Sequence, residues 1–179
     1  HTKSLSADPD SVSLQLIDYM SLAAFYSGAV FDPVHLDDLD RVDMAPYKVV
    51  VFANTFLLDE RDKTIIREKV ARNGRHLLWL YAPGYSDGKR LDEDFPGAVT
   101  GIVLKKIQAN APVFVDMDKA LGLDISEQLW GGAAPLFFFV YAQARAWGRF
   151  RQNGLPAFAS KQLPDHRAWF SAVPLLDAR

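Results

Sequence analysis

The stretch KVVVFAN, at residues 48–54, decides the fold. It is continuously apolar and rich in β-branched residues, which is typical of a strand buried on both faces of a parallel sheet. The segment 59–73 predicts a helix, because acidic side chains occupy its first turn, basic ones lie toward its end, and Gly74 stops it. A second buried strand is predicted at 76–81. Strand, helix and strand within about 35 residues predict a βαβ unit.

The rest of the chain extends this pattern on both sides. Before it, the sequence predicts a helix over 11–26, an extended piece at 31–36 and an acidic turn or short helix at 37–43. After Gly88 few helical patterns occur, and the predicted strands are 98–107, 112–115, 136–141 with 142–150 as its continuation or partner, 156–161 and 168–172. The predicted fold class is α/β: a doubly wound, mainly parallel sheet flanked by helices, with extra antiparallel strands in the C-terminal half.

Composition and charge limit the classes of function. The chain has 179 residues, 49% of them hydrophobic, which suits a single domain over 1–179. A formal net charge of −2 gives no electrostatic reason to expect nucleic acid or a membrane as partner. The absence of Cys excludes disulfides, thiolate metal sites and a thiol nucleophile. Because the chain opens on His1 rather than methionine, we expect a piece of a larger multidomain protein, whose compartment the sequence leaves open.

Four blocks, in order along the chain, resemble a known family. YKVVVFANTFLL (47–58) resembles the pattern YKVVVFANxFxL of amidotransferase-like domains in large bacterial proteins of the glycoside-hydrolase type. RHLLWLYAPGY (75–85) looks like the next block, TGI (100–102) is similar to a third and WFSAVPLL (169–176) to a fourth. The chain thus resembles the flavodoxin-related, class I glutamine amidotransferase-like domains, and is similar to the β-galactosidase trimerisation domain. Relatives usually begin with a strand, which 2–7 makes poorly, and continue past the last block into a further helix.

The resemblance also places a reactive site. In active class I amidotransferases a cysteine stands on a sharp turn after the strand that corresponds to 76–81, where its thiolate attacks the glutamine amide. That turn falls here at Ala82, Pro83, Gly84 and Tyr85. The first three residues have no side chain capable of attack. The resemblance therefore implies a degenerate nucleophile elbow and a domain without a catalytic residue.

Other catalytic and metal-binding patterns find little support. GYSDG (84–88) contains the G-x-S-x-G pattern of serine hydrolases, but no helix is predicted after it, so a surface turn is favoured. The acidic turn of Asp37, Asp38, Asp40 and Asp43 lacks the central glycine and terminal glutamate of a calcium loop. The four histidines lack a metal-ligand spacing, and no phosphate-binding glycine motif occurs. We therefore expect neither a metal nor a cofactor.

Two functional hypotheses remain, and a third ranks last. The first is a non-catalytic structural or oligomerisation domain of a carbohydrate-active protein, whose partners are neighbouring domains of the same polypeptide or identical subunits. The second is an accessory module for a small ligand or sugar, because ligands of open α/β sheets bind beyond the carboxyl ends of the strands. Its candidate residues are Asn54, Thr55, Tyr85 and Trp130. The last is an unrecognised serine hydrolase using Ser86 or Ser171.

Overall fold

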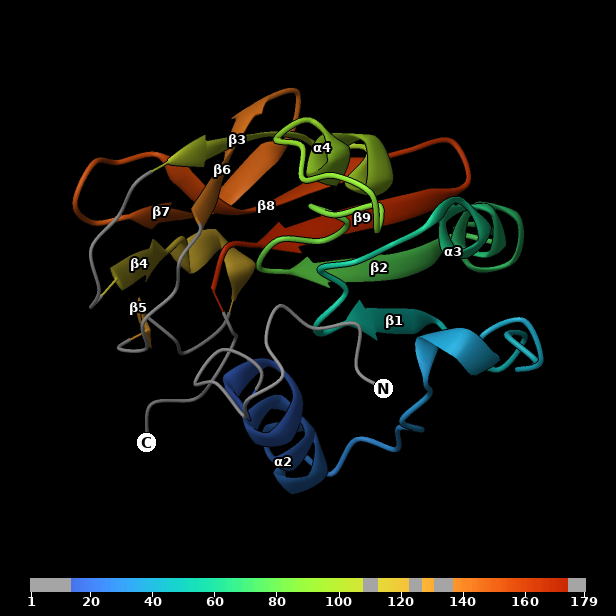
Figure 1. Ribbon diagram of the computed structural model, residues 1–179. Helices are drawn as coiled ribbons and strands as arrows, with labels where there is room; N and C mark the ends of the chain where they lie inside the picture. Colours follow the sequence, from blue (N-terminus) through green and yellow to red (C-terminus); the bar gives the residue numbers. More distant parts are fainter. Residues whose placement is uncertain (1–13, 108–112, 123–126, 131–136, 174–179) are drawn as a thin grey trace.

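The computed structural model describes residues 14–107, 113–122, 127–130 and 137–173 (Figure 1). Its large sheet has seven strands in the order β1-β2-β9-β8-β7-β4-β5, and a small sheet pairs β3 with β6. The strands of the large sheet are β1 (Val49–Phe52), β2 (Arg75–Leu80), β4 (Val113–Met117), β5 (Glu127–Trp130), β7 (Arg145–Phe150), β8 (Pro156–Gln162) and β9 (His166–Ser171). Those of the small sheet are β3 (Val103–Ile107) and β6 (Phe137–Ala142).

The helical segments are short. A π-helical segment, η1 (Leu14–Tyr19), runs directly into α2 (Met20–Tyr26), and α3 (Glu60–Ile65) continues as the π-helical η3 (Ile66–Val70). The others are α4 (Phe95–Thr100) and the 3-10 turns η2 (Leu36–Asp38) and η4 (Lys119–Leu121). The helices predicted over 11–26 and 59–73 are confirmed at 14–26 and 60–70, and residues 11–13 lie outside the described ranges. Within those ranges no helix is long and apolar enough to cross a membrane.

The large sheet is mixed. Strand β1 is parallel to β2 and β2 to β9, whereas β9-β8, β8-β7, β7-β4 and β4-β5 are antiparallel pairs. The predicted βαβ unit, β1-α3-β2, and the antiparallel strands of the second half are confirmed. The expectation of a mainly parallel sheet holds only for β1-β2-β9. The reason is that short connections join β7 to β8 and β8 to β9, and strands joined by a tight turn run antiparallel.

The strand predicted over 98–107 is wrong in its first part, where the chain forms α4. Pro96 lies in the first turn of this helix, and Gly101, with a φ of 71°, ends it in the left-handed conformation. The hydroxyl of Thr100 donates to the Pro96 carbonyl at 2.8 Å. The β-branched Val99 and Thr100 gave this segment a strand-like composition, which the helix-terminating glycine overrides. Only 103–107 form a strand.

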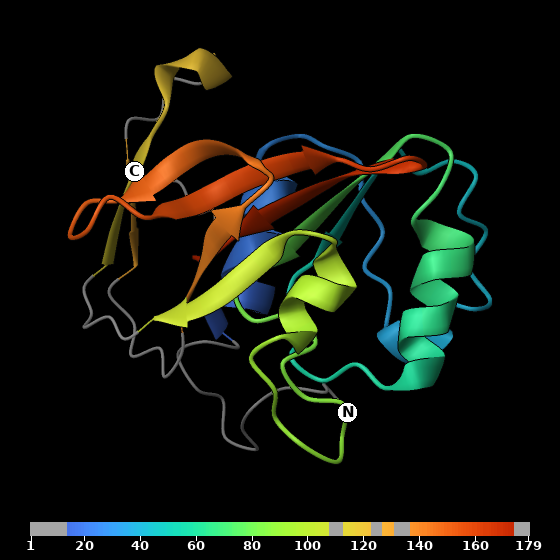
Figure 2. The same ribbon diagram turned by 90° about the horizontal axis from the view of Figure 1, so that it is seen from above.

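The two faces of the large sheet differ in how they are covered. Figure 2 shows α3, α4 and the β3–β6 pair on the same side of the large sheet. The side chains beneath them form the core, where the Phe52 and Trp79 rings stack with centroids 3.9 Å apart and Leu77 and Phe170 are fully buried. On the opposite side the alternate side chains near the amino ends of β1, β2 and β9 are exposed or half-buried, whereas Leu80, Phe158 and Ser171 farther along the strands are buried. We call this side the open face; it carries Val49, Val51, His76, Leu78, Trp169 and Trp147.

Candidate functional site

The turn after β2 is the predicted elbow. Tyr81, the first residue after the strand, has a φ of 67°, a value that bulky residues rarely adopt. The strained position is therefore Tyr81, one residue before the predicted segment 82–85. The backbone N–H of Tyr81 donates to the Ser171 carbonyl at 2.8 Å, which fixes the turn against the end of β9. The sharp turn thus lies at the carboxyl edge of the parallel strands, where the resemblance places it.

Backbone hydrogen bonds tie the elbow loop to the loop that follows β1. The N–H of Gly84 donates to the Thr55 carbonyl at 2.7 Å, and the N–H of Ser86 donates to the Phe56 carbonyl at 3.0 Å. Gly84 has a φ of 63°, and a Cβ atom there would lie 2.9 Å from Cγ2 of Val99 in α4. Only glycine fits this position. All residues of 81–86 are buried, so the loop is packed rather than presented to solvent.

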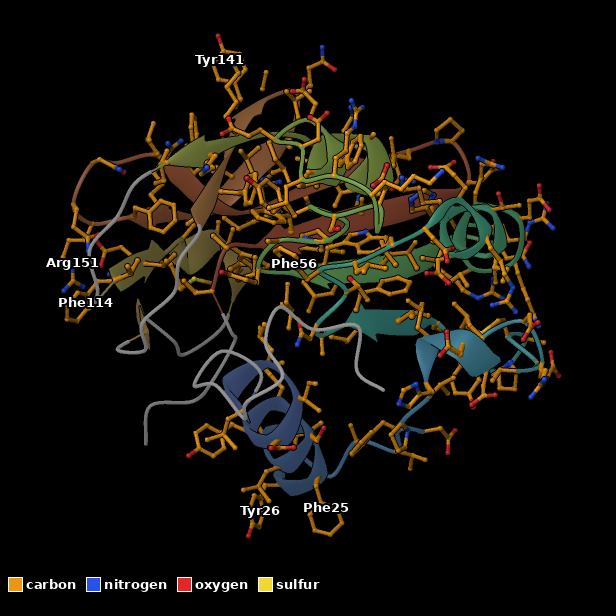
Figure 3. The ribbon with its side chains drawn as sticks, in the orientation of Figure 1. Phe25, Tyr26, Phe56, Phe114, Tyr141 and Arg151 are labelled. Atoms are coloured by element: carbon orange, nitrogen blue, oxygen red, sulfur yellow. The ribbon has the colours of Figure 1, made fainter. Side chains whose placement is uncertain are left out.

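Tyr85, a candidate ligand-binding residue, points into an aromatic cluster. Its ring contacts Phe56 and Phe138 edge to face, with centroids 5.6 and 5.5 Å apart. Figure 3 shows Phe56 inside the molecule, near the strand ends. The ammonium of Lys106 lies 5.9 Å from the Tyr85 centroid. Its hydrogen bond to Glu93, and to a smaller extent its hydrogen bond to Tyr85, raise the pKa of Lys106. These neighbours fill the space over the turn, and only 7% of Tyr85 is exposed.

The structure brings the loops of Thr55 and Tyr85 together, because the Thr55 carbonyl accepts the N–H of Gly84, but it leaves Trp130 apart from the other candidate ligand-binding residues. Asn54 and Thr55 follow β1 at one end of the large sheet, and Tyr85 lies in the aromatic cluster. Trp130 belongs to β5 at the other end of the sheet, where it pairs with Val113. Its side chain lies outside the part of the molecule that the structure describes. The sequence placed these residues by strand ends and local composition, neither of which reports the strand order.

A groove of about 530 Å³ lies beside β1 and was not predicted. The N-terminal helix, the connecting segment 30–44 and residues 49–55 line it, mainly with apolar side chains such as Met20, Phe31 and Leu36. Asn54 and Thr55 belong to its lining, and the buried hydroxyl of Thr55 has no hydrogen-bond partner among the described residues. Three segments that follow one another along residues 17–55 make this groove, and no local pattern indicates that they fold back onto one another.

The two candidate serine nucleophiles bond to backbone groups. Ser86 is buried, and its Oγ accepts a hydrogen bond from the N–H of Gly88 at 3.1 Å. Ser171 is fully buried, and its Oγ donates to the Val173 carbonyl at 2.7 Å. Neither bond involves a general base, and the helix nearest in sequence after GYSDG begins only at Phe95. A nucleophile needs an adjacent base and an exposed position. Both serines are buried, and within the described ranges neither hydrogen-bonds to a basic side chain.

The acidic turn engages cations and backbone groups. Asp38 pairs with Arg41 at 3.2 Å, Asp40 pairs with Arg61 at 2.8 Å, and an Asp43 oxygen accepts the N–H of Ala45 at 3.0 Å. In the ranges that the structure describes, no three or more His, Asp or Glu side chains gather as metal ligands would. The turn has the geometry of a solvated, capped loop.

Comparison with known proteins shows a similarity of fold. The sequence matches no protein-family model and no curated protein. A β-galactosidase described as polyextremophilic, from the Antarctic haloarchaeon Halorubrum lacusprofundi, matches 75% of this chain with a TM-score of 0.55 and 16% identity. The exo-beta-1,4-mannosidase Op5Man5 from Opitutaceae bacterium strain TAV5 matches 97% of it with a TM-score of 0.68 and 10% identity. The chain shares its fold with a part of two glycoside hydrolases. It spans 20% and 29% of the lengths of those two chains.

Proposed function

We propose that this chain is a non-catalytic, amidotransferase-like domain of a carbohydrate-active protein, and that it holds neighbouring domains or identical subunits together. The likeness of its fold to a minor part of two glycoside hydrolases supports this context. The β1-α3-β2 unit and the strained turn at Tyr81 support a core of the doubly wound, flavodoxin-related kind. The turn carries tyrosine, alanine, proline and glycine where a thiolate would be needed for amide attack.

An apolar surface around α2 carries the proposal. No residue of α2 is buried, and Phe25 and Tyr26 are 69% and 77% exposed. Figure 3 shows both rings projecting away from the molecule at the end of α2. Exposed apolar side chains of α2, of the segment after it and of β1 together form a surface that we call the N-terminal apolar surface. Its residues are Leu22, Phe25, Tyr26, Val30, Phe31, Val34, Val49 and Val51.

Such a surface favours a protein partner. Contiguous exposed apolar residues mark interaction sites, and aromatic residues contribute most of the binding energy at interfaces. Burying a phenylalanine side chain stabilises by about 1.5–3 kcal/mol. The strand β1 is also an end strand of the large sheet, and such edges need a cover. We infer that a second copy or an adjoining domain covers α2, the groove and the β1 edge together.

Light scattering coupled to size-exclusion chromatography, on the protein that carries this domain, tests the proposal. We expect the double variant Phe25→Ser, Tyr26→Ser to lower the oligomer mass or, where the partner is an adjoining domain, to speed proteolysis between the two. The matched control removes two other exposed apolar side chains, Val103 and Tyr141 of the small sheet, by Val103→Ser and Tyr141→Ser. Unchanged mass and unchanged proteolysis in the Phe25 and Tyr26 variant would contradict the proposal.

A second experiment tests the absence of catalysis. We expect the domain expressed alone to hydrolyse neither glutamine nor aryl esters, and deletion of the domain to impair the parent protein by disrupting its assembly. Turnover by the isolated domain, lost in Ser86→Ala or Ser171→Ala, would overturn the structural role. A monomeric parent whose activity survives deletion of the domain would also overturn it.

A further inference from the structure

An open pocket lies where β7, β8 and β9 run side by side, away from both the elbow and the groove. It is lined by Gln143, Ala144, Arg145, Trp147, Ser160, Lys161, Gln162 and Arg167. Three of these residues are cations and none is an acid. Among the described residues, no carboxylate forms an ion pair with Arg145, Lys161 or Arg167. The ammonium of Lys161 donates to the Gly101 carbonyl at 2.9 Å, and its strand partner is the buried Ala168, so it lies on the covered side of the sheet. The positive charge on the open face of the pocket therefore comes from Arg145 and Arg167.

The guanidinium of Arg145 is held in place by an aromatic ring. Its central carbon lies 3.7 Å from the ring centroid of Trp147, the geometry of a cation–π contact. Trp147 is itself fixed, because its Nε1–H donates to Oγ of Ser160 at 2.8 Å and its ring stacks on Trp169 with centroids 6.2 Å apart. An Arg group stacked in this way keeps its N–H fork for a ligand in the plane of the guanidinium.

The guanidinium of Arg167 is held by an amide. Its Nε–H donates to Oε1 of Gln162 at 3.2 Å, and Nε2 of Gln162 donates to the carbonyls of Leu163 and His166 at 2.9 and 3.1 Å. The amide is thus oriented by the turn between β8 and β9, and it orients the arginine in turn. Because this bond uses Nε, the two terminal nitrogens of Arg167 remain for a ligand.

The sheet register puts both arginines on the open face. Arg145 pairs with Ser160, and Arg167 pairs with Gln162. Paired residues of neighbouring strands point to the same side, and residues 160 and 162 of one strand share a side. Two strand spacings, roughly 10 Å, separate β7 from β9 across β8, and the two-residue offset between Ser160 and Gln162 adds about 7 Å along the strands. Both long side chains can therefore reach a single anion placed over β8, and that anion would relieve the repulsion between two cations.

We propose that this pocket binds an acidic sugar, a uronate unit of an oligosaccharide, whose carboxylate is held between Arg145 and Arg167. A guanidinium matches the two oxygens of a carboxylate with parallel N–H bonds. Gln143 is an exposed lining residue whose Oε1 accepts a hydrogen bond from Lys161 at 3.5 Å, and its Nε2–H groups can donate to ring hydroxyls. That the carboxylate belongs to a sugar rests on the function proposed above; the affinity for a carboxylate rests on the pocket alone.

Calorimetric titration of the 179-residue chain with trigalacturonate tests the inference, with its fully methyl-esterified form and a triglutamate peptide as the comparison ligands. We expect trigalacturonate to bind, and the uncharged ester and the peptide to bind about tenfold or more weakly. Arg145→Gln and Arg167→Gln should each weaken trigalacturonate binding about tenfold or more. Arg145→Lys keeps the charge but loses the planar fork, so its affinity for trigalacturonate should lie between that of the unaltered chain and that of Arg145→Gln.

The matched control is Arg149→Gln, on the same strand β7 but outside the pocket, which should bind as the unaltered chain does. Absence of trigalacturonate binding, equal binding of the ester, or equal losses in the Arg149 variant would overturn the carboxylate site. Equal binding of triglutamate would overturn the choice of a sugar. None of these variants alters the N-terminal apolar surface, so the oligomer mass of Arg145→Gln reports on the proposed function separately.

Discussion

At the scale of single residues, Arg75 joins several backbone segments. Its buried guanidinium donates to the carbonyls of Met44 at 2.8 Å, Tyr47 at 3.0 Å and Val70 at 3.3 Å, and so links the segment before β1 to the end of η3. We expect Arg75→Met to lower the free energy of unfolding by about 2–4 kcal/mol, because buried carbonyls lose their donors. Urea denaturation measures this. The control Arg72→Met, at an exposed position, should change stability by less than about 0.5 kcal/mol, and equal losses would refute the role of Arg75.

Gly84 permits a second comparison between two residues of one loop. Gly84 and Gly88 both have positive φ, but only Gly84 has neighbours that a Cβ atom would meet, Val99 at 2.9 Å and Leu58 at 3.3 Å. In both alanine variants the new residue must adopt a left-handed backbone conformation, which lowers the free energy of unfolding by about 1–2 kcal/mol. Gly84→Ala should cost about 1–3 kcal/mol more, because it overpacks the contact with α4. Thermal unfolding of the two variants gives the difference, and an absence of any difference would show that α4 yields to the added methyl group.

At the scale of elements, α3 begins with a reciprocal capping box. An Asp59 oxygen accepts the N–H of Asp62 at 2.9 Å, and an Asp62 oxygen accepts the N–H of Asp59 at 3.2 Å. We expect Asp59→Ala to destabilise the protein by about 1 kcal/mol. Glu60→Ala, which breaks only the exposed contact with Lys63, should cost about 0.5 kcal/mol or less. Denaturant midpoints of both variants test this, and a larger loss for Glu60→Ala would place the stabilising contact outside the box.

The elements that local sequence patterns define were the predictable ones. The strands β1 and β2 and the helix α3 follow from runs of apolar residues and from charges at the helix ends, which act within a few residues. Helix α4 was not predicted, because Val99 and Thr100 favour strands and the packing of Gly101 against Leu163 is a long-range contact. The same limit applies to the sites. The sharp turn after β2 was placed to within one residue from the end of a strand, whereas the groove and the arginine pocket depend on how successive segments fold back onto one another.

At the scale of the whole molecule, the pH dependence of stability reports on His166, the first residue of β9. Burial lowers the pKa of its ring, against the opposing effects of Asp165 and of a hydrogen bond with the Ala71 backbone. In acid the unfolded chain therefore binds a proton at His166 more readily than the folded chain does. The contribution of neutral His166 to the free energy of unfolding is fully present above the unfolded pKa of about 6.5 and is lost as pH falls below it. The free energy of unfolding should therefore decline between pH 7 and pH 5.

Two variants and a separate pH window check this assignment. His166→Gln should flatten the decline in urea titrations, whereas His35→Gln, at an exposed position, should retain it. A hydrogen bond from Arg151 lowers the pKa of Asp116, and backbone hydrogen bonds from Arg90 and Lys89 lower that of Asp87. These carboxylates stabilise above their unfolded pKa and lose that effect only in more acidic solution, near pH 4 and below. A decline between pH 7 and pH 5 that persists in His166→Gln would rule out this histidine as its source.

The position of β9 sets the order in which the chain can be completed during its synthesis. It is the strand nearest the C-terminus among those described, yet it lies between β2, which it meets in parallel, and β8, which it meets antiparallel. Until residues 166–171 have left the ribosome, no strand joins the β1-β2 pair to the β8-β7-β4-β5 group. The pairing of β9 with β2 must then close a long loop that reaches back to residue 75. A nascent chain stalled before His166 therefore keeps the edges of β2 and β8 unpaired, which makes it a substrate for chaperones and a hazard for aggregation.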